Sequence, residues 1–214
     1  SVSVEAKVPL AIIVDTKVII KAPFRLLASG CADVVSNKTA ILDWKLAQRL
    51  RGEEISTSAA TISDYAAETI ISNASAIKPN LEESIWTAIK PIIISGIAMA
   101  IAGSSRPTSG AEHMFSHMLD MLAPKKALHG EQCGIGTILM MYLHGGNWQR
   151  IRDSLSTIGA PTTAEQMGIP KETIIQALCK AHEVRTDRYT VLGDKGLTCE
   201  AAERLARITE VIGG

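Results

Sequence analysis

The stretch Ser104–Gln132 reads SSRPTSGAEHMFSHMLDMLAPKKALHGEQ and holds three of the five histidines of the chain. Residues 109–112, SGAE, have the S-x-x-E form of a capping box. This pattern predicts that a helix begins at about Gly110. The stretch decides how the rest of the chain is interpreted, because it combines a helix start with a cluster of side chains that can bind a ligand.

Two of these histidines, His113 and His117, are four residues apart, so they lie on one face of the predicted helix. The positive end of the helix dipole points toward whatever they hold. His129 follows a break at Pro124-Lys125-Lys126 and opens the next apolar run. The pattern predicts a helical hairpin that brings imidazoles together from both arms, and therefore a candidate site.

Composition narrows the class of protein. The 214 residues include 22 basic and 22 acidic side chains, so charge indicates no attraction to nucleic acid or to a membrane surface. Apolar residues make up 46% but aromatic residues only 4%, which favours closely packed helices over a β-sandwich. The four cysteines are far apart and form no C-x-x-C pair, which favours free thiols over disulfides.

A helical pattern starts after Pro23 and continues to the end of the chain. Before it, the β-branched segment Val8–Lys21 predicts two short strands around a turn. We therefore divide the chain into residues 1–22, the remnant of a sheet-containing domain, and residues 23–214, an all-helical domain. Helices are predicted at 24–36, 38–51, 58–77, from about 110, at 129–144 and 147–157, from 170 to about 182, and from 198 to about 212, with a short one capped by residues 162–165.

A further helix is predicted to be capped by Asn80 and to kink or restart at Pro91. The uncharged run Pro91–Ser105 is too short, and too rich in Gly and Ser, to span a bilayer. We expect this run to be a buried central helix.

The histidines suggest a metal site, because neutral imidazole is a good zinc ligand and a catalytic zinc takes three protein ligands. Asp33 is the best third donor, since it is the only acidic residue between Arg25 and Lys38 and an unpaired carboxylate there is costly. Two alternatives remain open: Asp33 caps a backbone turn or pairs with an arginine, and the histidine pair is structural. The H-E-x-x-H motif of metalloproteases is absent.

The loop 103–110, GSSRPTSG, combines hydroxyl groups with one guanidinium and leads into a helix, so it is a candidate phosphate site. An ordinary helix–helix connection explains its composition equally well. His144 and His182 are interpreted as C-terminal helix caps, not as ligands. The chain contains no G-x-G-x-x-G and no Walker motif, and hence no evident dinucleotide site.

A resemblance to a known family rests on two long motifs and several shorter ones. AGSSRPTSGAEHMFSHMLD and ALHGEQCGIGTILMMYLHGG, the latter followed by Trp148, resemble the archaeal-type sn-glycerol-1-phosphate dehydrogenases of the glycerol dehydrogenase and dehydroquinate synthase superfamily. Further similar stretches, in order along the chain, are APFRLLASGCADVVSNKTAILDWKLAQRLRGEE, IGAPTTAEQMGI and RYTVL. The resemblance thus covers nearly the whole chain.

The resemblance implies the helical C-terminal domain of the dehydroquinate synthase-like fold. It also implies a cytoplasmic, oligomeric, zinc-dependent oxidoreductase that interconverts dihydroxyacetone phosphate and sn-glycerol 1-phosphate with NAD(H) or NADP(H), for ether-lipid (membrane phospholipid) biosynthesis. By the family pattern, Asp33, His113 and His129 match the zinc ligands, while Asp33 and His117 match positions that touch the substrate. As a hypothesis, Arg106 with Ser104 and Ser105 holds the substrate phosphate.

The family's Rossmann-like domain is expected to precede Ser1 and to carry most of the nucleotide contacts, so the chain by itself is expected to be inactive. The rival interpretations are a glycerol dehydrogenase or dehydroquinate-synthase-like metalloenzyme, and a non-catalytic helical module whose histidines are structural.

Overall fold

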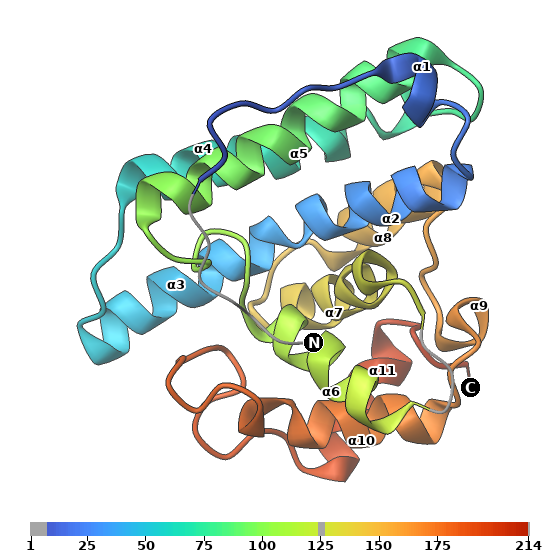
Figure 1. Ribbon diagram of the computed structural model, residues 1–214. Coiled ribbons are helices and arrows are strands. Elements are labelled where there is room, and N and C mark those ends of the chain that lie inside the picture. Colours follow the sequence, from blue (N-terminus) through green and yellow to red (C-terminus); the bar gives the residue numbers. More distant parts are fainter. Residues whose placement is uncertain (1–7, 124–126, 214) are drawn as a thin grey trace.

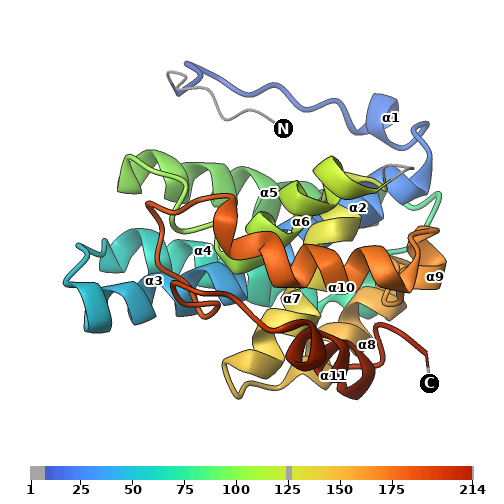
Figure 2. The same ribbon diagram turned by 90° about the horizontal axis from the view of Figure 1, so that it is seen from below.

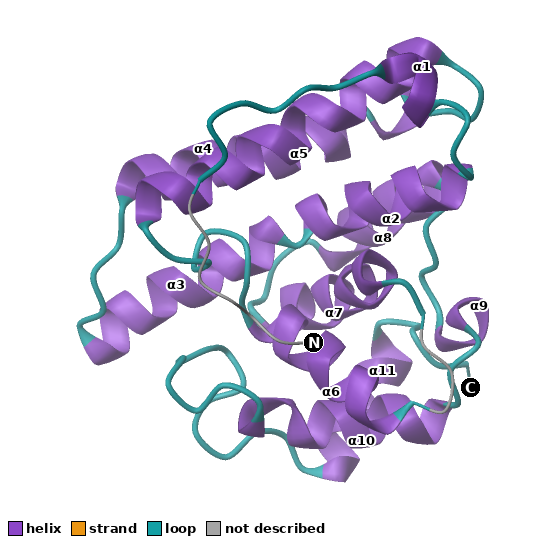
Figure 3. Ribbon diagram, viewed as in Figure 1, coloured by secondary structure: helices purple, strands orange, loops and turns teal. Residues whose placement is uncertain are grey.

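The computed structural model describes residues 8–123 and 127–213, and within them every regular element is a helix (Figures 1 and 3). The mainly α class predicted from the composition is confirmed. The α-helices are α1 Thr16–Ile19, α2 Phe24–Val35, α3 Asn37–Arg51, α4 Thr57–Ser72, α5 Glu82–Ala102, α6 Ala111–Leu122, α7 His129–Leu143, α8 Trp148–Ile158, α9 Ala164–Met167, α10 Lys171–Lys180 and α11 Cys199–Ile208. Two 3-10 helices, η1 Ala74–Ala76 and η2 Ala181–Glu183, complete the set.

Helix α7 lies at the centre and contacts α2, α6 and α8 (Figure 1). Helices α4 and α5 pack on α2 and on each other, while α10 packs against α6 and α11 on the opposite side (Figure 2). The predicted hairpin is present as the contacting pair α6 and α7. Its connection, the predicted break at residues 124–126, lies outside the described residues.

Glycines let α7 approach its neighbours closely. A Cβ on Gly130 would lie 1.9 Å from the carbonyl oxygen of Ser29 in α2, and a Cβ on Gly136 would lie 2.9 Å from the Cα of Glu112 in α6. Only residues without a side chain permit such backbone contacts. The sequence HGEQCGIG therefore determines how near the three helices lie, and hence how near their functional side chains lie.

The core is aliphatic, as the low aromatic content predicts. Large side chains that are fully buried come from α4, α6, α7, α8 and α10 and include Phe115, Ile70, Leu119, Ile138, Leu139, Leu155 and Ile174. At the surface, an ion pair between the exposed side chain of Arg25 in α2 and Glu131 in α7 links these two helices, with 2.5 Å between Nε and Oε1. The four cysteines are free in the structure, and the Sγ atoms of Cys179 and Cys199 lie 3.0 Å apart.

The two strands predicted within Val8–Lys21 are wrong for the described residues. Residues 8–15 are irregular and largely exposed, and Thr16–Ile19 forms the short helix α1, which is capped by the Asp15 side chain through the amides of Lys17 and Val18. β-branched residues make a strand only where a partner strand takes up their backbone hydrogen bonds, and no such partner exists among the described residues. The proposed domain boundary at residue 22 remains a prediction, and residues 1–7 lie outside the described part.

Helix α5 also differs from the prediction. It runs through Pro91 without restarting, its N-cap is Leu81, and Asn80 adopts a left-handed conformation instead of capping. The helix is not buried at the centre: it lies at the edge on α4 and α2, and Trp86 and Ile97 are 44% and 47% exposed. By length and composition alone α5 is able to cross a membrane, which is weak evidence because core helices of soluble proteins meet the same criterion.

Smaller differences concern helix ends. The helix predicted at 58–77 divides into α4 and η1, and the last helix ends at Ile208 instead of 212. In the predicted capping box, Ser109 does not cap with its side chain. Instead the Glu112 carboxylate accepts from the amide of Gly110 at 2.5 Å, and Asp43 of α3 accepts from the amide of Ala111 at 2.7 Å. A carboxylate 68 residues away thus replaces the local cap.

Candidate active site

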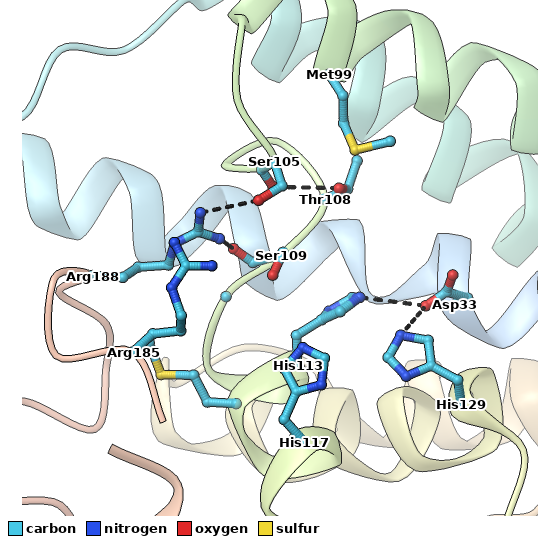
Figure 4. A pocket seen from close by; sticks show the side chains of 12 residues that line it. Asp33, Met99, Ser105, Thr108, Ser109, His113, His117, His129, Arg185 and Arg188 are labelled. Atoms are coloured by element: carbon cyan, nitrogen blue, oxygen red, sulfur yellow. Dashed lines mark hydrogen bonds and ion pairs between the residues drawn. The ribbon is translucent and has the colours of Figure 1, made fainter. Parts of the chain in front are cut away.

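A cavity of about 250 Å³ opens between α2, α5, α6, α7 and two loops (Figure 4). The loops are residues 103–110, between α5 and α6, and residues 184–198, between η2 and α11. The cavity is lined by Asp33, Met99, Ser105, Thr108, Ser109, Gly110, His113, Met114, His117, His129, Arg185 and Arg188. Four of the residues singled out in the sequence, the aspartate and three histidines, therefore share one cavity.

Three of these side chains converge at one end of the cavity (Figure 4). Asp33 Oδ1 lies 3.5 Å from His113 Nε2 and 3.7 Å from His129 Nε2. This oxygen is buried and has no hydrogen-bond partner among the described residues. An unsatisfied buried carboxylate oxygen facing two imidazole nitrogens matches the donor set of a divalent metal ion. Neither alternative for Asp33 is found in the described part of the chain, since the carboxylate forms no ion pair with an arginine and Oδ1 caps no turn.

Polar partners on Nδ1 orient the imidazoles of His113 and His129. His113 Nδ1 lies 3.1 Å from Oε1 of the buried Glu112, and His129 Nδ1 lies 3.0 Å from Ser116 Oγ. Partners on Nδ1 direct Nε2 of both rings toward Asp33, as they do for metal-ligating histidines in general. A purely structural histidine pair has no need for this convergence.

A fourth donor, Cys133, was missed by the sequence analysis. Its Sγ lies 3.5 Å from His129 Nε2, and the donor atoms of Asp33, His113, His129 and Cys133 all lie within 4.8 Å of one another. Burial raises the pKa of the Cys133 thiol to about 11, so without a metal it stays protonated at neutral pH. The four-residue spacing of His129 and Cys133 on one helix was the signal that could have found it.

Behind the cluster lies a buried acidic pair, Asp43 and Glu112. Burial raises the pKa of Asp43, which accepts from the Val191 amide at 2.6 Å and contacts His144 Nε2 at 3.0 Å. Burial also opposes ionisation of Glu112, but hydrogen bonds, led by the one with His113, lower its pKa overall. Glu112 is therefore held as a carboxylate that orients His113.

The other histidines have distinct roles. The ring of His117 lies 6.3 Å from that of His113 and 5.8 Å from that of His129, at the cavity wall. Burial and these two neighbours lower the pKa of His117 to about 4, so its imidazole is neutral at pH 7. His144 is the C-cap residue of α7, as predicted, and His182 lies in η2.

The structure does not bring Arg106 into the cavity, in contrast to the sequence-based hypothesis. Its side chain is buried, pairs with Glu53 (Nε to Oε1 2.6 Å) and donates to the Tyr189 carbonyl at 3.1 Å. Ser104 accepts from the Arg106 amide and does not line the cavity, whereas Ser105 does. Arg185 and Arg188 are the arginines of the cavity. Sequence reasoning missed them because they are about 80 residues beyond loop 103–110 and carry no spacing signal of their own.

Comparison with known proteins places this geometry in context. The chain is 65% identical, over 210 residues, to the glycerol-1-phosphate dehydrogenase (NAD(P)+) of Methanothermobacter thermautotrophicus, covering 98% of this chain and 60% of that protein. It is 60% identical to the protein of the same name in Methanosarcina mazei, covering 98% of this chain and 59% of that one. No family model matches the chain.

Two solved structures share the fold at low sequence identity. Sulfoacetaldehyde reductase from Bifidobacterium kashiwanohense, solved in complex with NAD+, aligns with a TM-score of 0.62 at 14% identity, covering 89% of this chain and 52% of that one. Maleylacetate reductase from Rhizobium sp. strain MTP-10005 aligns with a TM-score of 0.57 at 13% identity, covering 89% and 54%. The resemblance described from the sequence motifs is confirmed: this chain is a close relative of the archaeal glycerol-1-phosphate dehydrogenases over nearly all of its own length, and it spans about three fifths of theirs.

Proposed function

We propose that the chain is the metal- and substrate-binding part of an NAD(P)-dependent oxidoreductase that interconverts dihydroxyacetone phosphate and sn-glycerol 1-phosphate. The observation that carries the proposal is the convergence of Asp33, His113 and His129 on one wall of a small cavity. The 65% identity to a protein named for this activity supports the choice of substrate. In this proposal the histidines take part in the reaction and do not only stabilise the fold.

The metal in this proposal is zinc. The residues fit it, because a carboxylate oxygen without a hydrogen-bond partner faces two imidazole nitrogens whose other nitrogens are already anchored. Three protein ligands leave a coordination position for substrate, as in catalytic zinc sites. Asp33, His113 and His129 are the proposed ligands, and the nearby Cys133 is not assigned as a fourth.

A bound zinc ion would supply a Lewis acid for the ketone or alcohol oxygen of the substrate. The chain's own residues do the rest. Asp33 is proposed to contact both the metal and the substrate. The neutral imidazole of His117 is proposed to orient a substrate hydroxyl and to relay the proton of that hydroxyl. A bound nicotinamide coenzyme would supply or accept the hydride exchanged with the substrate carbon, and we assign its nucleotide contacts mainly to a Rossmann-like domain outside these residues.

The wider setting follows from this activity. The product supplies the glycerol backbone of ether lipids, and the coenzyme pool favours a cytoplasmic enzyme that does not insert into the membrane. Exposed apolar residues on α5, among them Trp86, Ile97 and Ile101, are proposed to contact a second copy of the chain, so we propose a homo-oligomer. Light scattering on the purified protein measures that state directly.

Metal analysis tests the first step. After dialysis against zinc, about one zinc per chain is expected for the wild type and none for an Asp33→Asn, His113→Ala double variant. Equal metal contents in the two proteins would contradict the assignment and favour the alternative of a helical module with structural histidines.

Activity tests the second step. We would replace the matching segment of the Methanothermobacter relative with this chain, so that the relative supplies the rest of the enzyme, and follow NADH and NADPH oxidation. Turnover with dihydroxyacetone phosphate, but little with dihydroxyacetone, is the expected result. The opposite preference would favour the glycerol dehydrogenase alternative.

A further inference from the structure

The end of the cavity opposite the metal donors is formed by Arg188 and hydroxyl-bearing residues (Figure 4). The guanidinium donates from Nη1 to the Ser109 carbonyl at 2.6 Å and from Nη2 to Ser105 Oγ at 3.0 Å. Thr108 Oγ1, which also lines the cavity, donates to the Ser105 carbonyl at 3.3 Å. Loop 103–110 thus holds the Arg188 side chain in place while leaving it at the cavity wall.

Within residues 8–123 and 127–213, Arg188 forms no ion pair with a carboxylate, whereas Arg106 pairs with Glu53 and Arg185 pairs with Asp187. Burial, reinforced by Arg185 and Arg106 and only partly opposed by the more distant carboxylates of Asp187 and Glu112, lowers the pKa of Arg188 to about 10, which still leaves it charged at neutral pH. A partly buried guanidinium beside two other cations is costly unless an anion compensates it.

The N-terminus of α6, which also faces this end, is not available for that anion. The amides of Gly110 and Ala111 already donate to the carboxylates of Glu112 and Asp43. An anion at this end must therefore be bound by side chains. A guanidinium has five N–H donors, two of which Arg188 uses, so donors remain for a ligand.

We propose that Arg188, assisted by Arg185 and by the hydroxyl of Ser105, binds the phosphate group of the substrate. The assignment rests on the proposed function and deepens it: the metal end takes the carbonyl or alcohol carbon, and the Arg188 end takes the phosphate. A planar guanidinium binds two phosphate oxygens at once, and the Ser105 hydroxyl, which accepts from Arg188 and keeps its own proton, can donate to another oxygen of the tetrahedral group. Arg188 thereby selects a phosphate ester over the unphosphorylated compound.

Calorimetric titration of inorganic phosphate into the metal-free chain tests this subsite. Loss of the charge-assisted bonds in Arg188→Ala is expected to weaken phosphate binding by roughly tenfold to hundredfold. The control is Arg204→Ala, which removes an exposed arginine of α11 away from the cavity and is expected to leave binding unchanged. Undetectable binding to the wild type, unchanged binding to Arg188→Ala, or equal loss in Arg204→Ala each overturns the proposal.

Two further measurements keep the test decisive. If Arg188→Ala does not fold, Arg188→Lys keeps the charge but loses the two-oxygen geometry, and phosphate affinity equal to that of the wild type overturns the subsite. In the chimaeric enzyme, Arg188→Ala with an unchanged KM for dihydroxyacetone phosphate overturns the subsite and leaves the proposed function intact. A chimaera that prefers dihydroxyacetone, in a chain that binds phosphate through Arg188, overturns the function and leaves the subsite intact.

Discussion

The two ends of the cavity are built in different ways. At the metal end, each donor is carried by a separate helix, α2, α6 or α7, and the helices are held close by Gly130 and Gly136. At the arginine end, the functional groups are on two loops, residues 103–110 and 184–198, which are tied together by Arg188 to Ser109 and by Arg106 to Tyr189. One end depends on helix packing and the other on hydrogen bonds between loops.

We expect the groups at the first end to be fixed in position and those at the second end to adapt to a ligand. Donors on packed helices keep their geometry without a ligand, which suits a metal that requires fixed distances. Groups on loops that are joined by a few polar contacts open at lower free energy than a packed core. The substrate end is therefore the one that we expect to move during entry and release, and the predictions below test the contrast.

The largest effect is expected for the proposed metal ligands, Asp33 and His113. Asp33→Asn with His113→Ala should abolish zinc binding, because it removes two of the three proposed donors. Cys133→Ser is the matched control, since it alters the fourth nearby donor and should retain about one zinc per chain. Loss of zinc in Cys133→Ser would make the thiol a ligand and contradict the three-ligand assignment.

Packing around the metal end is tested at Gly130. A Cβ there would lie 1.9 Å from the Ser29 carbonyl oxygen, so Gly130→Ala should lower the free energy of unfolding by about 3 kcal/mol through forced separation of α2 and α7. Gly96→Ala on exposed α5, where nothing lies within 4 Å of the added methyl, should instead raise it by about 0.5 kcal/mol. Chemical denaturation measures both, and equal effects would mean that the close approach does not matter.

The two arginines at the other end are expected to separate stability from binding. Arg106→Ala removes a buried ion pair with Glu53 and the tie to Tyr189, and should cost about 2 kcal/mol of unfolding free energy, moderated because Glu53 is 34% exposed. Arg188→Ala should cost clearly less, because no carboxylate is left behind. Denaturation curves of the two variants in parallel give the answer. Greater destabilisation by Arg188→Ala would identify it as the structural arginine.

These residues also show what a sequence can predict. Helical periodicity indicated the pair His113 and His117, the isolation of Asp33 in an apolar segment indicated a third donor, and only the family resemblance selected Asp33, His113 and His129, which the structure brings together. At the arginine end, the choice between Arg106 and Arg188 depends on which guanidinium finds a carboxylate, and Glu53 is remote in sequence from both. The segment Val8–Lys21 was misassigned for a related reason, because strand propensity has no effect without a partner strand. Local patterns predict helices and donors on them, but not long-range pairing.

Orientation of a ligand histidine should have a smaller effect than removal of the ligand. Glu112→Gln keeps the volume but replaces the carboxylate that lies 3.1 Å from His113 Nδ1. We expect zinc affinity to fall by about tenfold, the lower end of the range for such outer partners. Competition with a chelator measures it. Affinity equal to that of the wild type would mean that packing alone orients His113, and the metal end would then depend on helix geometry even more strictly.

The smallest effect is expected away from the cavity, at Glu68 of α4. The hydrogen bond from Arg150 and, to a lesser degree, the contact with Lys38 lower the pKa of Glu68 to about 2. Because the folded-state pKa lies below the unfolded value of about 4.3, this contribution to stability is present above that value and is lost as the pH falls toward 2. Glu68 is 37% exposed, so solvent screening limits the contribution to less than about 1 kcal/mol. The difference in unfolding free energy between the wild type and Arg150→Ala should therefore become smaller as the pH falls from the unfolded carboxyl pKa of about 4.3 toward 2. Denaturation of both proteins at each pH measures this difference. A difference that stays constant over this range would show that Arg150 acts through packing, as the helices at the metal end do, and not through its charge.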